Sequence, residues 1–152
     1  MIVYIIVFIT IFIIDILTKY WALGACNQEV VITPFLSCEL IINRGFSWSL
    51  FHSSSTLVFF IVSAVILCAI GALGVHTLYQ WRAGKNILGE VMVLSGALAN
   101  MLDRVMYGGV IDFIVVHYQA YTWPVFNVAD MAVVVGVACM FFINWHEHET
   151  AR

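Results

Sequence analysis

The apolar stretch from Leu57 to Tyr79 limits what this chain can fold into more than any other feature, because it contains no Asp, Glu, Lys or Arg. A helix of about 20 mostly apolar residues crosses the hydrocarbon core of a bilayer. Three further stretches are mostly apolar, at residues 2–20, 87–104 and 128–145. The stretch 87–104 is the weakest candidate, because it contains Glu90 and Asn100 and ends in Asp103 and Arg104. We therefore predict a mainly α-helical membrane protein with four transmembrane helices, which form a single domain over the whole chain.

The composition supports a membrane location. Hydrophobic residues make up 63% of the 152 residues and charged residues 10%, whereas soluble domains have about 45–50% and about 25%. A soluble core of this size could not bury so much apolar surface. The net charge of -3 and the lack of a basic run in the sequence argue against a nucleic-acid-binding protein.

The sequence also predicts an orientation in the membrane. The first span has no basic segment before it and no small-residue cleavage site after it, so we expect a retained helix and not a signal peptide. Arg82 and Lys85 lie close together in the short connection 80–86, and Lys and Arg are enriched in short cytoplasmic loops. Although the basic residues as a whole divide evenly between the two sides, this pair favours cytoplasmic termini.

Residues 22–56 form a long connection that we expect on the outer membrane face. β-branched residues on both sides of Pro34 partly alternate with polar ones, which predicts short strands there. Cys26 and Cys38 fall in the same connection and could form a disulfide in an oxidising compartment, a question that the sequence leaves open. A second outer connection is expected at residues 105–126.

Ionisable and amide side chains gather near one end of the predicted spans. At about 1.5 Å of rise per residue, Asp15 and Asn100 lie about 20 Å from the cytoplasmic ends of their helices. Polar residues inside spans are costly and by default indicate function. Their distribution predicts a site that opens to the outer leaflet. The set is Asp15, Lys19, Asn100, Asp103, Arg104, Asp112, Asn127 and Asp130.

Some of these residues also have a purely structural interpretation. Asp15 and Lys19 have the i, i+4 spacing of a helix ion pair. Asn127 and Asp130 have the spacing of a capping box at the start of the fourth span. Asp112 is harder to explain structurally, because a lone carboxylate in an apolar run after a diglycine turn costs desolvation energy without an obvious return.

Four separated blocks of the sequence resemble the motifs of one known family. Residues 15–19 resemble D-x-x-T-K, and residues 43–50 resemble a block with N-x-G. Residues 95–104 and 109–113 together resemble G-G-x-x-G-N-x-x-D-R…V-x-D-F, and residues 126–130 resemble F-N-x-A-D. By these motifs, which extend over nearly the whole chain, the sequence resembles the lipoprotein signal peptidases, or signal peptidase II family, which are bacterial membrane aspartic proteases.

The resemblance implies both a function and a site. It implies that Asp112 and Asp130 form a catalytic dyad that activates water, with no metal or organic cofactor. The implied substrate is a diacylglyceryl-modified prolipoprotein, cut just before its lipidated cysteine. The implied setting is the bacterial cytoplasmic (inner) membrane, with the active site near the outer face beside a small β-cradle. We expect a monomer in contact with membrane lipids and sensitive to globomycin-like peptides. The remaining positions, implied to bind substrate or shape the site, are Asp15, Lys19, Asn43, Gly45, Asn100, Asp103, Arg104 and Asn127.

Four residues depart from the motifs of the family. Ser95 and Ala99 stand where the family has glycine, and Phe46 and Trp48 stand where it has a small residue and Phe. Ala99 is still small enough for close helix packing. The sequence leaves open whether Phe46 and Trp48 change the specificity or the sensitivity to globomycin-like peptides.

The implied dyad needs two carboxylates that share one proton. Like charges at short range cannot both ionise cheaply, so one pKa rises and the other falls. Asp130 lies in the first turn of a predicted helix, where the helix dipole favours the anion. The apolar neighbours of Asp112 favour the neutral acid. We therefore predict that Asp130 is the base and Asp112 the acid in the resting state.

Two other functions fit part of the pattern. A carrier or channel subunit would use the aspartates of the first, third and fourth spans as a relay, but the second span offers it only Ser63, Thr77 and His76. A catalytically inactive homologue would bind lipidated chains, yet all the matching acids are present. His146 and His148 could bind a metal, but we interpret them as part of a solvated tail.

Overall fold

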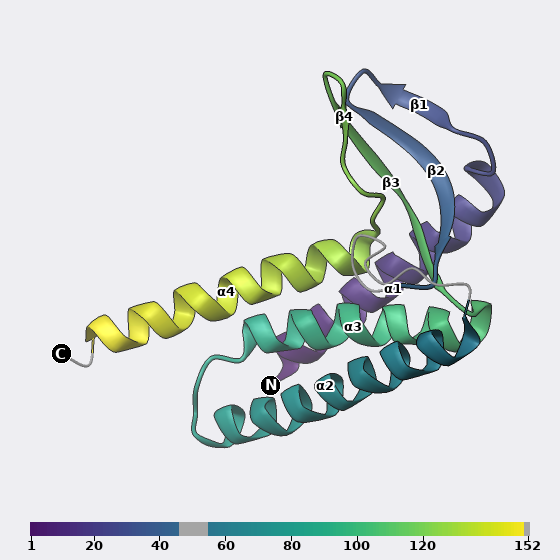
Figure 1. Ribbon diagram of the computed structural model, residues 1–152. Helices are drawn as coiled ribbons and strands as arrows, with labels where there is room; N and C mark the ends of the chain where they lie inside the picture. The colour runs from purple at the N-terminus through teal and green to yellow at the C-terminus, as the bar shows by residue number, and fades with distance from the viewer. Residues whose placement is uncertain (46–54, 151–152) are drawn as a thin grey trace.

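The computed structural model describes residues 1–45 and 55–150, so Phe46 and Trp48 lie outside the described residues. Each predicted span is a helix, and a four-stranded antiparallel sheet lies at one end of the helices (Figure 1). The elements in chain order are α1 (Ile2–Ala25), β1 (Val30–Thr33), β2 (Leu36–Asn43), α2 (Thr56–Arg82), α3 (Leu88–Tyr107), β3 (Val110–Tyr118), β4 (Tyr121–Thr122) and α4 (Val128–Thr150).

Three of the helices present apolar side chains to their surroundings. Large hydrophobic side chains are exposed along α1, α2 and α4, among them Ile6, Phe60 and Val134. Among the described residues, α1 and α2 are long and apolar enough to cross a membrane, and Val128–Ile143 of α4 forms a shorter apolar helix. Helices satisfy their own backbone hydrogen bonds, so an outward apolar surface of this kind suits lipid as the solvent.

α3 is the central helix, and it contacts each of α1, α2 and α4. It carries the buried charged side chains Glu90, Asp103 and Arg104. A Cβ on Gly96 of α3 would collide with the backbone carbonyl of Ala129 in α4, so the two helices pack there backbone to backbone. The helix with the most polar sequence is thus the one most enclosed by the other helices.

α1 continues to Ala25, five residues beyond the predicted end of the first span. The added turn is held by tertiary contacts, because Ala22 is buried in a cluster with Phe113 of β3. A disulfide joins Cys26, just after α1, to Cys38 of β2, with 5.5 Å between the Cα atoms. The pairing that the sequence left open is therefore present and ties the sheet to the end of α1.

The sheet has the strand order β1-β2-β3-β4. β1 and β2 confirm the strands predicted on both sides of Pro34. The connection 105–126, for which no strand was predicted, contributes β3 and β4. Gly108 ends α3 with a left-handed backbone (φ 69°), which glycine adopts without strain and which turns the chain into β3. The partner of β3 is β2, with Ile41 opposite Asp112, and this long-range pairing leaves no local signal in the sequence.

Both chain termini and the connection between α2 and α3 lie at the end of the helices remote from the sheet (Figure 1). Arg82 and Lys85, on which the predicted orientation rests, are therefore at the opposite end of the molecule from the sheet. The structure thus separates a sheet end from a basic connection end.

Candidate active site

Asp112 occupies the third position of β3 and is 3% exposed. Both of its carboxylate oxygens accept hydrogen bonds from side-chain amides. Asn127 Nδ2 donates to Oδ1 at 2.7 Å, and Asn43 Nδ2 donates to Oδ2 at 3.0 Å. The Asn43 amide is itself oriented, because its Oδ1 accepts from the Gly45 N–H at 2.9 Å. The carboxyl group is therefore held in one position by donors that cannot easily turn around.

The pKa of the Asp112 carboxyl is raised from 3.8 to about 7, first by burial and second by the nearby Asp130 carboxyl. The hydrogen bonds from Asn43 and Asn127 favour the anion and oppose this rise. Asp112 lies in the sheet, outside the helices. A pKa near neutral pH favours a group that both gives and takes a proton.

Asp130 lies in the first turn of α4 and forms the capping box that its spacing predicts. Its backbone N–H donates to Asn127 Oδ1 at 2.8 Å, and its own Oδ2 accepts from the Asn127 N–H at 3.3 Å. The capping interpretation does not account for the whole residue, because Oδ1 accepts a further bond from Asn100 Nδ2 at 2.8 Å. One carboxylate oxygen of Asp130 thus caps the start of α4, and the other accepts a hydrogen bond from α3.

Asn127 connects the two carboxyl groups. Its side-chain amide donates to Asp112 and its backbone N–H donates to Asp130, and the residue is fully buried. The same Nδ2 also lies 3.2 Å from Asn100 Oδ1. A fixed residue of this kind sets the spacing between two groups that belong to different elements, β3 and α4.

Lys19 is the centre of a second network, which lies behind the residues that contact Asp112 and Asp130. Its Nζ lies 2.7 Å from Asp15 Oδ2, 2.7 Å from Asp103 Oδ2 and 2.7 Å from Asn100 Oδ1. The predicted i, i+4 ion pair of Asp15 and Lys19 is therefore present, but as part of a larger cluster. Asp15 Oδ1 also accepts a hydrogen bond from the backbone N–H of Ala129, at the start of α4, at 2.7 Å. Asp103 Oδ2 accepts one from the backbone N–H of Ile111, in β3, at 3.2 Å. The cluster fixes α1, α3, α4 and β3 relative to one another.

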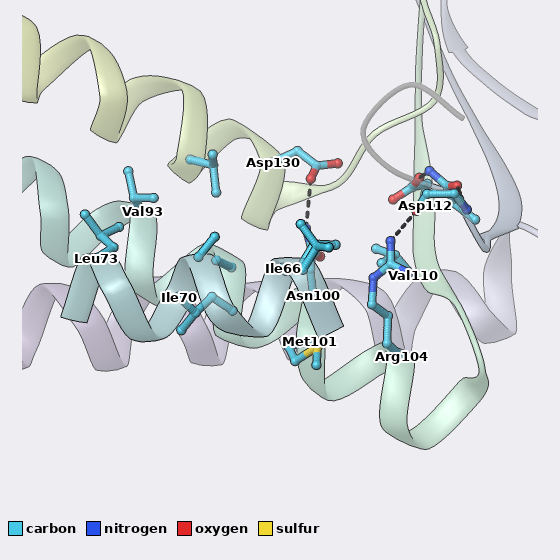
Figure 2. A pocket seen from close by; sticks show the side chains of 16 residues that line it. Ile66, Ile70, Leu73, Val93, Asn100, Met101, Arg104, Val110, Asp112 and Asp130 are labelled. Atoms are coloured by element: carbon cyan, nitrogen blue, oxygen red, sulfur yellow. Dashed lines mark hydrogen bonds between the residues drawn. The ribbon is translucent and has the colours of Figure 1, made fainter. Parts of the chain in front are cut away.

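Asp112 and Asp130 both line a pocket of about 330 Å³. In Figure 2, Asp112, Asp130 and Arg104 lie at one end of the pocket, and Leu73 and Val93 lie at the other. Six of the ten predicted site residues line it: Asn43, Gly45, Asn100, Arg104, Asp112 and Asp130. The other four lie behind these and support them: Asp15, Lys19, Asp103 and Asn127.

Arg104 lines the pocket and contacts residues outside its own helix. Its guanidinium donates to the backbone carbonyl of Gly45, and it lies 3.5 Å from Ser63 Oγ of α2. It also stacks over the ring of Phe59, with the Cζ atom 5.6 Å from the centroid. One side chain of α3 thus contacts both α2 and the chain just after β2.

Two of the departures from the motifs of the family lie in α3 behind the pocket. Ser95 is fully buried and its Oγ donates to the backbone carbonyl of Phe8 in α1 at 2.8 Å. Ala99 is 1% exposed, in keeping with a small residue at a close helix contact. Ser95 therefore adds an interhelical hydrogen bond that a glycine could not make.

The sequence did not identify the apolar wall of the pocket. This wall comes mainly from α2, through Val65, Ile66, Ala69, Ile70 and Leu73. The five residues repeat with helical spacing, which is the only sequence signal they carry. Because α2 is apolar on all sides, that spacing does not distinguish a face that lines a pocket from a face that contacts lipid.

Within the described part of the chain, no three His, Cys, Asp or Glu side chains are grouped so that they could hold a metal ion. The side chain of His148 lies outside that part. The interpretation of His146 and His148 as a solvated tail therefore stays a prediction.

Comparisons with known proteins identify relatives of the chain. A family model described as "Signal peptidase (SPase) II" matches residues 7–146. A lipoprotein signal peptidase of Blochmanniella pennsylvanica is 37% identical over 135 residues, covering 85% of this chain and 80% of the relative. One of Clostridium acetobutylicum is 41% identical over 128 residues, covering 81% and 80%.

A solved structure described as a bacterial membrane enzyme has the same fold as this chain. It matches with a TM-score of 0.75 and 26% sequence identity, covering 99% of this chain and 92% of that one. The similarity includes the helices and the sheet, since nearly the full length of both chains is matched. Together with the apolar helices and the family match, it establishes that this chain is a membrane protein and belongs to the signal peptidase II family.

Proposed function

We propose that the chain is an intramembrane aspartic endopeptidase. It removes the signal peptide from diacylglyceryl-modified prolipoproteins by cutting just before the lipidated cysteine. Family membership supports a protease that acts on prolipoproteins, because its relatives are lipoprotein signal peptidases. The observation that carries the aspartic assignment is the position of Asp112 and Asp130 at one end of an apolar pocket, linked through Asn127.

In the proposed reaction Asp130 starts as the anion and Asp112 as the neutral acid. Asp130 accepts a proton from a water molecule whose oxygen attacks the peptide carbonyl carbon, while Asp112 gives its proton to the carbonyl oxygen. The tetrahedral intermediate then breaks at the C–N bond as Asp130 gives its proton to the leaving nitrogen. Asp112 regains its proton from a hydroxyl group of the intermediate, which becomes the carbonyl of the product. The position of Asp130 in the first turn of α4 supports the anionic start, because the helix dipole favours negative charge there.

The surrounding residues act as positioning groups in this proposal. Asn43 and Asn127 hold the Asp112 carboxyl, and Asn100 holds that of Asp130. The Lys19 cluster fixes the elements that carry them. Such pre-organisation lowers the barrier because the groups need no rearrangement during the reaction.

The proposed orientation places the sheet outside the bacterial cytoplasmic membrane and both termini in the cytoplasm, with all four helices spanning the bilayer. It is supported by Arg82 and Lys85 at the end remote from the sheet and by the disulfide beside the sheet, since disulfides persist in oxidising compartments. The acyl chains of the substrate remain in the bilayer, which restricts the approach of the scissile bond to the membrane plane. We propose that the enzyme acts as a monomer.

The test is cleavage of a diacylglyceryl-modified prolipoprotein by the purified protein in detergent. We expect the parent to cut before the lipidated cysteine, and Asp112→Asn and Asp130→Asn to be slower by about 10²–10⁴-fold, the usual contribution of general acid–base catalysis. Glu39→Gln, an exposed carboxylate of the sheet, is the matched control and keeps the parental rate. A folded parent that leaves well-modified substrate intact would refute the function, and an active Asp variant would refute the dyad alone.

A further inference from the structure

Glu90 is a buried carboxylate that the proposed reaction does not use. It lies in the first turn of α3 and is 3% exposed. Its Oε2 has no hydrogen-bond partner among the described residues, and its Oε1 lies 4.0 Å from Nε2 of His76 in α2. The positive end of the α3 dipole favours an acid at this position. The dipole does not supply the missing hydrogen-bond donor, and an unsatisfied buried carboxylate is costly.

The position of Glu90 on α3 is on the face that lines the pocket. Val93, Ala97, Met101 and Arg104 all line the pocket, and they follow Glu90 at three, seven, eleven and fourteen residues. This spacing is that of one helix face. Glu90 therefore lies about one turn beyond the last pocket residue of α3, on the side away from the two aspartates.

On α2, the opposite wall of the pocket, a polar residue likewise lies about one helical turn beyond the last pocket residue. Leu73 is the last residue of α2 that lines the pocket, and His76 follows it by three residues, close to one helical turn. Leu73 and Val93 lie at the end of the pocket away from Asp112 and Asp130 (Figure 2). The Glu90–His76 pair thus lies about one helical turn beyond the apolar end of the pocket, and the His76 side chain is 52% exposed.

The distance along α3 from Asn100 to Glu90 matches the length of the apolar h-region of a signal peptide. Asn100, which contacts Asp130, and Glu90 are ten residues apart on α3, or about 15 Å along the helix. A signal peptide has a positively charged n-region, then an apolar h-region of about 7–15 residues, then the cleavage site. As a helix, that h-region is about 10–22 Å long. An h-region alongside α3 with its cleavage site at the aspartates therefore brings the n-region to Glu90.

We propose that Glu90 binds a basic side chain in the n-region of the bound signal peptide. This proposal rests on the proposed function. The h-region lies against the apolar wall from α2, and a Lys or Arg side chain displaces the imidazole of His76 and donates to Oε2 of Glu90. The carboxylate at one end of the pocket and the aspartates at the other together set the register of the substrate.

The experiment compares two diacylglyceryl-modified prolipoproteins that differ only in the n-region, with its Lys residues kept or changed to Gln. In a detergent that carries no ammonium group, we expect the parent to have a roughly tenfold lower KM for the basic substrate, the size of one charge-assisted hydrogen bond. Glu90→Gln should remove this preference and leave kcat unchanged. Glu149→Gln, an exposed acid at the same end of the molecule, should keep it.

The outcomes separate this proposal from the function on which it rests. If the parent cuts neither substrate, the proposed function fails. If the parent cuts both equally well, or if Glu90→Gln lowers the rate on both by the same factor, the binding role of Glu90 is refuted and its role is structural. Glu90→Asp keeps the charge and part of the preference, and it replaces Glu90→Gln if that variant does not fold.

Discussion

Replacing Asp112 with Asn tests the protonation state on which the proposed reaction depends. The folded protein holds the Asp112 proton up to about pH 7, whereas the unfolded chain releases it near 3.8. Between these values the native state binds more protons than the unfolded state, so the free energy of unfolding of the parent falls as pH rises and levels off above about 7. Asn does not titrate, so the variant lacks this loss.

The size of the effect follows from the same pKa values. A pKa of about 7 in place of 3.8 corresponds to about 4 kcal/mol, lost by the parent across this pH range. Asn also places an NH₂ group against one of the two amide donors, Asn43 or Asn127, which costs about 1–3 kcal/mol at every pH. The variant should therefore be less stable than the parent near pH 4 and as stable or more stable near pH 8.

The assay is thermal unfolding of parent and variant in the same detergent at several pH values from about 3.5 to about 8.5, a window that brackets both pKa values. We expect the Tm difference between Asp112→Asn and the parent to rise with pH by roughly 10 °C, at about 2–4 °C per kcal/mol for a chain of this size. The exposed control Glu39→Gln should follow the parent. Parallel curves for Asp112→Asn and the parent would show that the folded carboxyl is ionised throughout, and the acid role of Asp112 would be refuted.

Three further variants test the scaffold by thermal unfolding. Gly96→Ala should lower the free energy of unfolding by about 1–3 kcal/mol, because its Cβ meets the Ala129 carbonyl. The control Gly71→Ala, where a Cβ meets nothing, should keep the parental Tm, and equal Tm values for the two variants would contradict the close contact. Lys19→Met should cost about 3–5 kcal/mol by leaving two buried carboxylates uncompensated, and a parental Tm would argue against the cluster. Cys26→Ser should cost about 2–4 kcal/mol, and reductant should lower the Tm of the parent alone.

The positions of the helices could be predicted because the length of an apolar run is a local property. The run from Leu57 to Tyr79 lies inside α2, and each of the other three predicted spans overlaps a helix. The capping box of Asn127 and Asp130 was also predictable, because its bonds join residues three apart. The continuation of α1 past the predicted span was not predictable, because Ala22 and its turn are held by packing against β3, which is distant in the sequence.

The site could be predicted only as a set of residues and not as an arrangement. Motif positions identified Asp112 and Asp130, but the spacing of residues does not reveal that Asn127 bonds to both. The sequence likewise left open whether Cys26 and Cys38 pair, since that depends on β2 lying beside the end of α1.

The sequence by itself therefore determined that this chain enters a membrane, where its helices run and which family it belongs to. Only the tertiary structure decided which sides of those helices meet one another. α2 is apolar all round, so nothing local distinguishes Ile66 and Leu73, which line the pocket, from their lipid-facing neighbours. β3 reaches β2 only after α3 has turned at Gly108, and that pairing sets Asp112 within reach of Asn43. The bridge between Ile114 of β3 and Phe126 brings Asn127 to the same carboxyl group. Contacts between segments distant in the chain, and not the pattern within any one segment, create the site.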